Sequence, residues 1–405
     1  CPVGALNNKP YRYSARAWEM EQRATISPHD CVGSNLYAHV LRGTIKRVVP
    51  RDNESINESW IADRDRFSYE AIYSPERLLN PRIKENGEWR DVDWADALSL
   101  AAEVLSAAGA DMTGIIASPS ATVEEAYLLT QLASHLGTNN IDHRIARRDT
   151  SNQDADPVYE DLGCTIEALE SQGAILVAGS NIRNEAPIIA HRLRKASLNG
   201  TKISFANSNE YEYFFDVADY VSGQGLVALL AGIAVAAADG KDLPAALASI
   251  CDGIFASEAD KRIASGLKDA DDSLLLLGNI AGRHAAYSAV RALAAIIGEL
   301  TGAKIGNITE GPNSAGASLA GVLPHRGAAG KKRNNPGLDV AGMLENDLEL
   351  VLLVNVEPDL DIHAINGAVS RLSKQKHVIA LTPYVSGGLL EAADLLLPIG
   401  SFAET

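Results

Sequence analysis

Cys1 and Pro2, the first two residues of the chain, form a pair that could bind iron. In bacterial-type iron–sulfur sequences, a proline follows the last cysteine ligand of the run. Thiolates hold such clusters because a soft, anionic sulfur matches iron and offsets its charge. One Cys-Pro pair is weak evidence, so the surrounding sequence must decide whether Cys1 is a metal ligand.

The other three cysteines, Cys31, Cys164 and Cys251, lie far apart in the sequence. This spacing in a long chain does not favour a disulfide framework, and it indicates a reducing compartment. We expect Cys164 and Cys251 to be small buried apolar residues rather than nucleophiles.

Common catalytic motifs are missing from the sequence. Neither His-Glu-x-x-His nor Gly-x-Ser-x-Gly occurs. GAAGKK at 327–332 has too few residues between its glycines for a Walker phosphate loop. The histidines do not cluster, and we expect His191 and His284 to pack or cap near helix starts. The sequence therefore predicts no catalytic residue.

Small-residue loops follow three predicted strands, where an α/β sheet could bind a phosphate or dinucleotide. They are Ser118-Pro119-Ser120, Gly179-Ser180-Asn181 and Gly278-Asn279-Ile280. None forms a complete Gly-x-Gly-x-x-Gly fingerprint, so ordinary turn chemistry is the favoured interpretation.

The totals exclude several function classes. The chain has 405 residues, which predicts two or three domains. Its formal charge is 36 − 52 = −16, which argues against nucleic-acid binding. Residues 1–50 carry 7 − 3 = +4, and this basic end either faces an acidic partner or anionic cluster or is a chance clustering. The longest apolar stretches, such as 225–238, are shorter than the ~20 residues of a membrane helix.

Periodicity predicts a β hairpin at 34–49 around Arg42-Gly43 and, from about residue 93, alternating strands and helices. The segment 122–137 is predicted to be a helix with a Thr122/Glu125 capping box and Gly137 as its stop, and 186–197 a helix with Pro187 in its first turn. Such alternation makes parallel βαβ units, and at least two stacked doubly wound sheets fit the count. The Gly-, Asn- and Pro-rich stretch 306–340 is either functional or a mobile surface loop.

A family resemblance gives Cys1 its context. CPVGALNNKPYRYSARAWE resembles the segment that closes the second iron–sulfur domain of the large iron–sulfur subunit of respiratory complex I, the NADH-quinone oxidoreductase. DCVGSNLYAHVLRGTIKRVVPRDNESINESWIADRDRFSYE is similar to the next domain. GSNIRNEAPIIAHRLRKA and EGPNSAGASLAGVLPHR resemble its large C-terminal domain, which is similar to molybdopterin oxidoreductases.

The resemblance implies an α/β fold with molybdopterin oxidoreductase-like doubly wound sheets, preceded by a small β-rich vestigial cluster domain. The expected domains are 1–23, the end of a [4Fe–4S] ferredoxin-like domain; 24–80, the vestigial domain; and 81–405, the α/β domain, truncated at its C-terminus.

The resemblance also implies that Cys1 is the fourth thiolate of a [4Fe–4S] cluster. The other three lie upstream in a Cys-x-x-Cys-x-x-Cys run, as does a [2Fe–2S] site. Some relatives hold a further cluster in the 24–80 domain. The corresponding positions here are Ser27, Asp30 and Ser34, with Ala62 or Asp63 near the last ligand, and Cys31 is one residue out of register. No cluster there and no molybdopterin are therefore expected.

The implied function is electron relay from NADH through FMN and iron–sulfur clusters to quinone. The fragment would be part of the translocating NADH:quinone oxidoreductase without a complete active site of its own. Expected partners are the FMN/NADH-binding and quinone-module subunits of the peripheral arm, at the cytoplasmic face of the bacterial inner membrane, without direct membrane insertion. The alternatives are a molybdopterin-dependent oxidoreductase, such as a formate dehydrogenase or nitrate reductase, and a pure scaffold.

Overall fold

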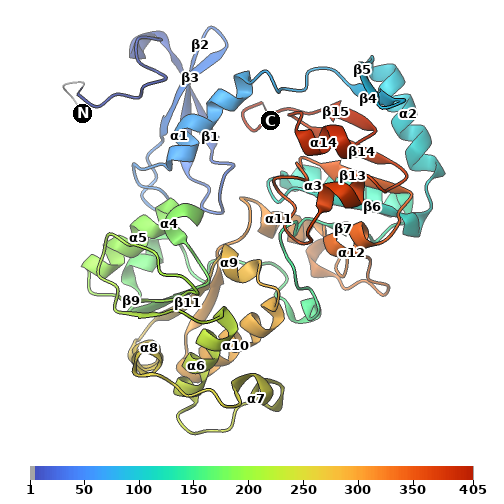
Figure 1. Cartoon of the computed structure of the whole chain (residues 1–405). Coiled ribbons are helices and arrows are strands. Elements are labelled where there is room, and N and C mark those ends of the chain that lie inside the picture. Colours follow the sequence, from blue (N-terminus) through green and yellow to red (C-terminus); the bar gives the residue numbers. More distant parts are fainter. Residues whose placement is uncertain (1–4, 405) are drawn as a thin grey trace.

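The computed structural model describes residues 5–404, so Cys1 lies outside the described residues. Figure 1 shows a small β domain at the N-terminal end and two separate α/β lobes. No helix within residues 5–404 combines the length and the apolar character needed to cross a membrane.

The small domain is a three-stranded antiparallel sheet in the order β1-β2-β3. Its strands are β1 (Glu21–Ile26), β2 (Asn35–Leu41) and β3 (Thr44–Pro50), preceded by the short helix η1 (Ala17–Glu19) and followed by α1 (Asp63–Phe67) and η2 (Ser68–Tyr73). The predicted hairpin is confirmed: Arg42 and Gly43 both have positive φ, as a two-residue turn between strands requires. The pairing of β1 with β2 starts at Glu21, which lies opposite Val40. The sheet therefore begins three residues before residue 24, the expected start of this domain.

The five-stranded lobe has a fully parallel sheet in the order β10-β9-β8-β11-β12. Its strands are β8 (Ala174–Ala178), β9 (Lys202–Ala206), β10 (Asp219–Val221), β11 (Ser273–Leu277) and β12 (Lys304–Asn307). Its helices are η5 (Glu167–Ser171), α4 (Ile182–Glu185), α5 (Pro187–Leu198), α6 (Leu226–Ala238), α7 (Ala245–Cys251), α8 (Glu258–Asp269), α9 (Asn279–Gly282) and α10 (Tyr287–Thr301). Helices α6, α8 and α10 cover one face of the sheet, and α5 covers the other.

The seven-stranded lobe has the strand order β5-β4-β15-β14-β13-β6-β7, in which the β4–β5 hairpin forms an antiparallel edge. Its strands are β4 (Arg82–Glu85), β5 (Glu88–Asp91), β6 (Thr113–Ala117), β7 (Ile141–Asp142), β13 (Leu350–Val354), β14 (Val378–Thr382) and β15 (Leu395–Pro398). Helices α2 (Trp94–Ala107), α3 (Val123–Leu136) and α11 (Ser314–Ala320) cover one face, and α12 (Val340–Glu345), α13 (Ala368–Leu372) and α14 (Gly387–Ala392) cover the other. The short helices η3 (Ala110–Met112), η4 (Gln153–Ala155) and η6 (Ala328–Gly330) lie in its connections.

Several sequence predictions are confirmed in these lobes. Thr122 and Glu125 form the capping box of α3, and Gly137 ends that helix in the left-handed conformation. Pro187 stands in the first turn of α5. The alternating strands and helices form two doubly wound sheets.

One expectation was wrong. The sheets are not stacked but lie in separate lobes (Figure 1), because helices already bury both faces of each sheet and leave no face for a second one. For the stretch 306–340 the sequence left a functional segment and a mobile surface loop open, and the structure folds part of it into regular elements. It contains the end of β12 and the whole of α11, and residues 320–326 are buried.

The chain builds the five-stranded lobe as an insertion into the seven-stranded one. Strands β6 and β7 precede the inserted lobe in the sequence, and β13 to β15 follow it. The chain therefore crosses between the lobes twice, through residues 143–173 and 308–339. These two crossings form walls of a pocket between the lobes.

Candidate functional site

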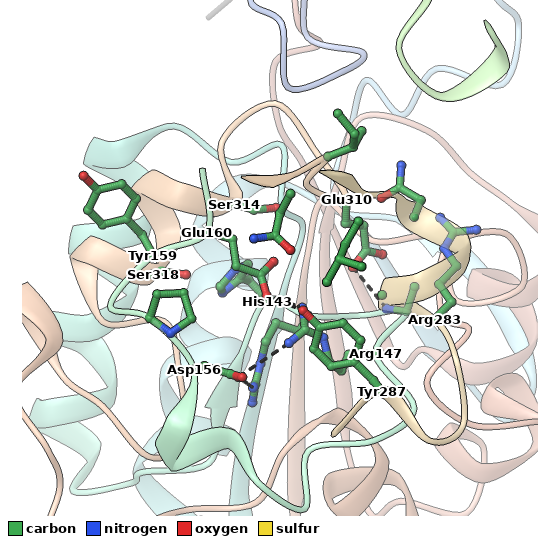
Figure 2. A pocket seen from close by; sticks show the side chains of 18 of the residues that line it. His143, Arg147, Asp156, Tyr159, Glu160, Arg283, Tyr287, Glu310, Ser314 and Ser318 are labelled. Carbon is green, nitrogen blue, oxygen red and sulfur yellow. Dashed lines mark hydrogen bonds and ion pairs between the residues drawn. The ribbon is translucent and has the colours of Figure 1, made fainter. Parts of the chain in front are cut away.

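The interlobe pocket lies at the carboxyl ends of β7, β11 and β12, the edge of an α/β sheet at which ligands bind. Three segments line it: 143–160, 277–287 and 307–325. It encloses about 750 Å³ of unfilled space, including its open mouth. Figure 2 shows charged side chains from these segments pointing toward one another across the pocket.

An ion cluster forms one wall of this pocket. Arg144 donates two hydrogen bonds to Asp142, with N···O distances of 2.9 and 2.8 Å. Arg147 donates to Glu160 at 2.7 Å, and the Tyr287 hydroxyl donates to the same oxygen at 3.0 Å. The Arg147 guanidinium also lies 4.1 Å from the centre of the Tyr287 ring.

Asp156 joins the arginines of the cluster. Its carboxylate lies 3.5 Å from Arg147 and 4.0 Å from Arg144, and it pairs with Arg291 from α10. The cluster therefore contains three guanidinium groups (Arg144, Arg147, Arg291) and three carboxylates (Asp142, Asp156, Glu160), whose formal charges cancel. Burial alone would raise the pKa of Glu160, but Arg147 outweighs it and holds that pKa below its ordinary value.

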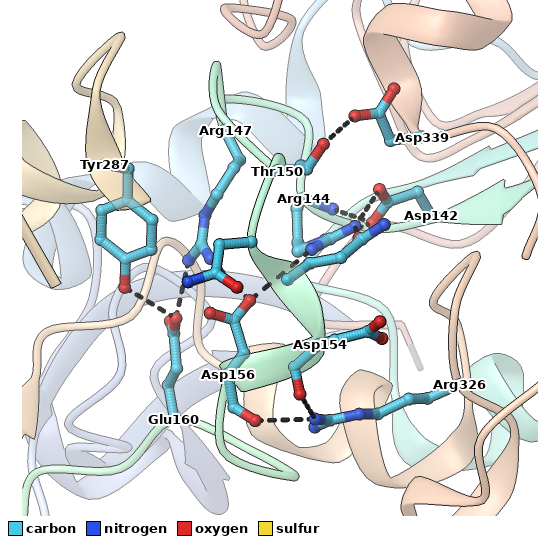
Figure 3. Close-up of polar contacts among 12 residues, drawn as sticks. Asp142, Arg144, Arg147, Thr150, Asp154, Asp156, Glu160, Tyr287, Arg326 and Asp339 are labelled. Carbon is cyan, nitrogen blue, oxygen red and sulfur yellow. Dashed lines mark hydrogen bonds and ion pairs between the residues drawn. The ribbon is translucent and has the colours of Figure 1, made fainter. Parts of the chain in front are cut away.

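The loop that carries Asp156 and Glu160 is tied down from several sides (Figure 3). Arg326 donates to the carbonyl oxygens of Pro157, Asp154 and Asp156 at 2.6, 3.1 and 2.7 Å. The Thr150 hydroxyl donates to Asp339 at 2.5 Å. Arg326 is buried at the end of the segment 321–326 and cannot move freely. Its three hydrogen bonds therefore fix the position of the loop.

Burial favours the neutral form of two ionisable groups in the pocket. It raises the pKa of Glu310 to about 7, against the opposing charge of Arg283. Burial, together with the charges of Arg144 and Arg326, lowers the pKa of His325 to about 4. Only 3% of His325 is exposed, and among the described residues neither of its ring nitrogens has a hydrogen-bond partner.

Two of the three strand-end loops meet around one carboxylate. Glu185 accepts hydrogen bonds from the Ser180 hydroxyl at 2.7 Å, from the Asn181 N–H at 2.9 Å and from the Asn279 N–H at 3.0 Å. The donors that could face a phosphate between β8 and β11 are thus satisfied by the protein's own side chain.

The third loop, after β6, is closed by the chain as well. The Ser118 N–H donates to the Val354 carbonyl at 2.9 Å. The Asn313 side chain donates to the Ala121 carbonyl at 2.6 Å. This loop therefore has turn chemistry, as its sequence predicted.

The sequence did not identify the residues of the ion cluster. Its signal was the run DHRIARRD at 142–149, in which charged residues follow the two-residue strand β7 directly. That strand was too short to predict from periodicity, so the run was not assigned to a strand end. No sequence pattern pointed to His325, whose burial follows from tertiary packing.

The two histidines singled out in the sequence have structural roles. His284 Nδ1 accepts from the Ala286 N–H at 3.0 Å just before α10 begins. His191 Nε2 lies 3.1 Å from Glu58 and its ring packs against Trp60. Cys251 is buried in the apolar core beside α6, and Cys164 is partly buried beside the other face of that sheet.

Two of the expected vestigial cluster positions in the small domain make polar side-chain contacts, whereas the buried Ser34 hydroxyl has no hydrogen-bond partner among the described residues. The Ser27 hydroxyl lies 2.5 Å from Asp65, and Asp30 pairs with Arg64 at 2.5 Å. Arg64 also donates to the carbonyl oxygen of Glu185 at 2.7 Å and so connects this domain to the five-stranded lobe.

Cys31 follows Asp30 directly, but its thiol makes none of these contacts. Its side chain packs against the apolar core beneath α5, and burial raises its pKa to about 11. Ala62 is the N-cap residue of α1, which begins at Asp63. In the described part of the chain, no three His, Cys, Asp or Glu side chains group as metal ligands.

Asp65 gives the small domain a pH-dependent stability. Burial raises its pKa to about 6, although the Ser27 hydrogen bond opposes this. Because the folded-state pKa exceeds the unfolded one, the fold favours the protonated acid, and stability falls as the pH rises through about 6. Asp65→Asn is therefore expected to raise the free energy of unfolding by about 1–3 kcal/mol at pH 8.

The test is urea denaturation of both proteins between pH 4 and pH 8. The gain should shrink to a small remainder near pH 4, where Asp65 is protonated in the folded state and about half protonated in the unfolded one. Equal stability of the two proteins at pH 8 would contradict the prediction.

Comparison with protein families gives two matches. Residues 77–405 match the model of the molybdopterin oxidoreductases. Residues 21–70 match the NADH-ubiquinone oxidoreductase NDSU1/NuoG-like 4Fe-4S domain.

The chain is also similar to curated proteins over about half of its length. It is 33% identical over 216 residues to a subunit of the NADH-quinone oxidoreductase of Rickettsia felis, a match that covers 52% of this chain and 32% of that protein. It is 34% identical over 213 residues to the NADH-ubiquinone oxidoreductase 75 kDa subunit of Reclinomonas americana, covering 49% and 30%. The matches therefore span about a third of the length of these relatives.

Solved structures share the fold at low sequence identity. Acetylene hydratase from Pelobacter acetylenicus superposes with a TM-score of 0.64 at 12% identity, over 94% of this chain and 63% of that one. A chain of the formyltransferase/hydrolase complex of Methylorubrum extorquens gives 0.54 at 17% identity, over 79% and 86%.

The residues of this chain do not fit the two cofactors that these matches suggest. A molybdopterin dinucleotide carries phosphates, which bind to cationic side chains and N–H donors. In this chain Arg144, Arg147 and Arg291 already pair with carboxylates of the protein. The N–H donors at the strand ends already bond to Glu185. A [4Fe–4S] cluster needs thiolates, and residues 21–70 contain only Cys31, which packs against the apolar core.

Proposed function

This chain belongs to the molybdopterin oxidoreductase family, and from that premise we propose that it is part of the large iron–sulfur subunit of an NADH:quinone oxidoreductase. The intact subunit would relay electrons from NADH, through FMN and iron–sulfur clusters, toward quinone. The enzyme would be the translocating type, respiratory complex I, with the peripheral arm on the cytoplasmic face of the bacterial inner membrane.

One observation carries the proposal: a NuoG-like 4Fe-4S domain directly precedes a molybdopterin oxidoreductase domain in the same chain. The curated NADH-quinone oxidoreductase relatives support the same assignment. The filled anion positions of the interlobe pocket argue that the second domain is a framework here and not a molybdenum enzyme.

The division of the chain follows from this role. Residues 1–23 would end a ferredoxin-like cluster domain, 24–80 would form the vestigial cluster domain, and 81–405 would form the α/β framework. The fragment would contain no complete active site. Partners would be the FMN/NADH-binding and quinone-module subunits.

Cys1 is the residue of this chain that would touch a cofactor. It would supply the fourth thiolate of a [4Fe–4S] cluster, whose other three would come from a preceding Cys-x-x-Cys-x-x-Cys run, and the [2Fe–2S] site would lie upstream as well. When bound, such a cluster accepts and passes on single electrons. The protein around it would bind it, shield it from water and set its potential.

Cys1→Ser in the full-length subunit tests this role. We expect one [4Fe–4S] signal to disappear from the electron paramagnetic resonance spectrum and the iron content to fall by about one cluster of four irons. Cys31→Ser is the matched control, because Cys31 is a thiol packed against the apolar core and outside any ligand group, and it should leave both measurements unchanged. Full iron occupancy of Cys1→Ser would overturn the assignment of Cys1.

A molybdopterin-dependent oxidoreductase is the second candidate, because residues 77–405 match the model of that family. Elemental analysis of the purified full-length protein separates the two. We expect iron without molybdenum, and molybdenum at one atom per chain would decide for the second candidate.

A further inference from the structure

We propose that Asp156 and Glu160 are built-in counter-ions that occupy the place of a ligand's phosphates in the interlobe pocket and so keep nucleoside diphosphates out. The proposal deepens the framework role proposed above, because it names the residues that close the pocket. It also implies that removing these two carboxylates exposes a latent pyrophosphate site.

The arginines of the ion cluster are arranged as a ligand site would need them: Arg144 and Arg147 line the pocket, and Arg291 joins them through Asp156. Arg144, Arg147 and Arg291 come from two segments far apart in the sequence, and their guanidinium groups converge on the two carboxylates of one loop. Figure 3 shows Arg144 and Arg147 directed toward this loop. Side-chain exposure is 10% for Arg147 and 15% for Arg291. Planar guanidinium groups bind carboxylate and phosphate oxygens in the same geometry.

Buried arginines need a counter-ion, and here the protein supplies it. An unpaired buried charge costs several kcal/mol, so a guanidinium cluster without its own carboxylates would have to bind an external anion. Asp142 neutralises Arg144 through two hydrogen bonds and is independent of the loop. The remaining two positive charges, on Arg147 and Arg291, are matched by Asp156 and Glu160.

The loop is fixed in position and does not need to close over a ligand. Arg326 binds three of its carbonyl oxygens, and Asp149 accepts from the Ser288 N–H at 2.8 Å at the start of α10. A phosphate that binds Arg147 would have to displace Glu160, which already pairs with that guanidinium. The approach would bring the negative phosphate next to the negative Glu160 carboxylate, and the two would repel each other.

The experiment measures binding of inorganic pyrophosphate to the full chain by titration calorimetry, with sodium chloride of equal ionic strength as the blank. The wild-type protein should show no saturable binding up to millimolar pyrophosphate. Asp156→Asn/Glu160→Gln leaves two unmatched arginines in place and should bind pyrophosphate at least about tenfold more tightly than the wild type.

Glu170→Gln is the matched control. Glu170 pairs with Arg192 and Lys195 in a second ion cluster that lies away from the interlobe pocket. The Glu170→Gln substitution removes a carboxylate that pairs with an arginine, as the test variant does, but at another place in the fold. It should therefore not create pyrophosphate binding. Binding by this control to the same degree would show a non-specific charge effect and overturn the proposal.

Two further results would overturn it. One is micromolar pyrophosphate binding by the wild type, a measurement that does not depend on any variant folding. The other is a folded double variant, with an unchanged circular dichroism spectrum, that binds no better than the wild type. Should the double variant not fold, Glu160→Gln alone frees one face of Arg147 and should still bind more tightly than the wild type. Loss of the Cys1 iron signal is a separate readout, so failure here leaves the proposed function standing.

Discussion

Arg192→Ala is expected to lower the free energy of unfolding by about 3–5 kcal/mol, because it removes a buried guanidinium that bonds two carboxylates and leaves the carbonyl oxygens of Glu54 and Ile56 without their donor. Arg192 lies on α5 and is only 2% exposed. It donates to Glu58 at 2.9 Å and to the Ile56 carbonyl at 3.0 Å, and it also pairs with Glu170. The side chain therefore fastens the small domain to the five-stranded lobe.

Lys195→Ala is the control for this prediction. Lys195 contacts the same two carboxylates, Glu58 and Glu170, but its side chain is 33% exposed. Because water screens such a pair, its loss should cost about 1 kcal/mol or less. Urea denaturation of both variants measures the difference. An equal decrease in the free energy of unfolding for the two variants would contradict the prediction, because it would mean that burial does not determine how much each cation of this cluster stabilises the fold.

Gly306→Ala is expected to cost about 3 kcal/mol or more, because a methyl group cannot fit there. A Cβ atom on Gly306 would lie 2.0 Å from the Leu162 carbonyl oxygen, a backbone atom that cannot rotate away. The same contact region holds the edge strand β12 to the crossing segment, since the Asn307 N–H donates to the Asp161 carbonyl at 2.6 Å.

Gly266→Ala in α8 is the matched substitution with the opposite expected sign. The nearest atom to its Cβ position is 3.9 Å away, on the flexible side chain of Lys202. Alanine in a helix interior should therefore stabilise the protein by about 0.5–1 kcal/mol. Thermal unfolding followed by circular dichroism compares the two variants. A Gly306→Ala midpoint at or above that of Gly266→Ala would refute the close contact.

The sequence alone predicted the elements whose signals are local. The capping box of Thr122 and Glu125, the left-handed stop at Gly137 and the Arg42-Gly43 hairpin each depend on neighbouring residues, and each is confirmed. The resemblance of residue runs to a known family identified the molybdopterin oxidoreductase fold, which the family model confirms.

Tertiary structure alone decided how distant segments meet. Arg147 and Glu160 are paired with Tyr287, more than a hundred residues away, by an insertion of one lobe into another. No periodicity reports such pairing, because it depends on where the chain crosses between lobes. The same holds for the separation of the two sheets and for the burial of 320–326. It also holds for Glu185, for which the sequence predicted no role and which accepts three hydrogen bonds in the fold. Local hydrogen bonds and side-chain spacing determine helices and turns, whereas the neutralised pocket depends on charges that only folding brings together.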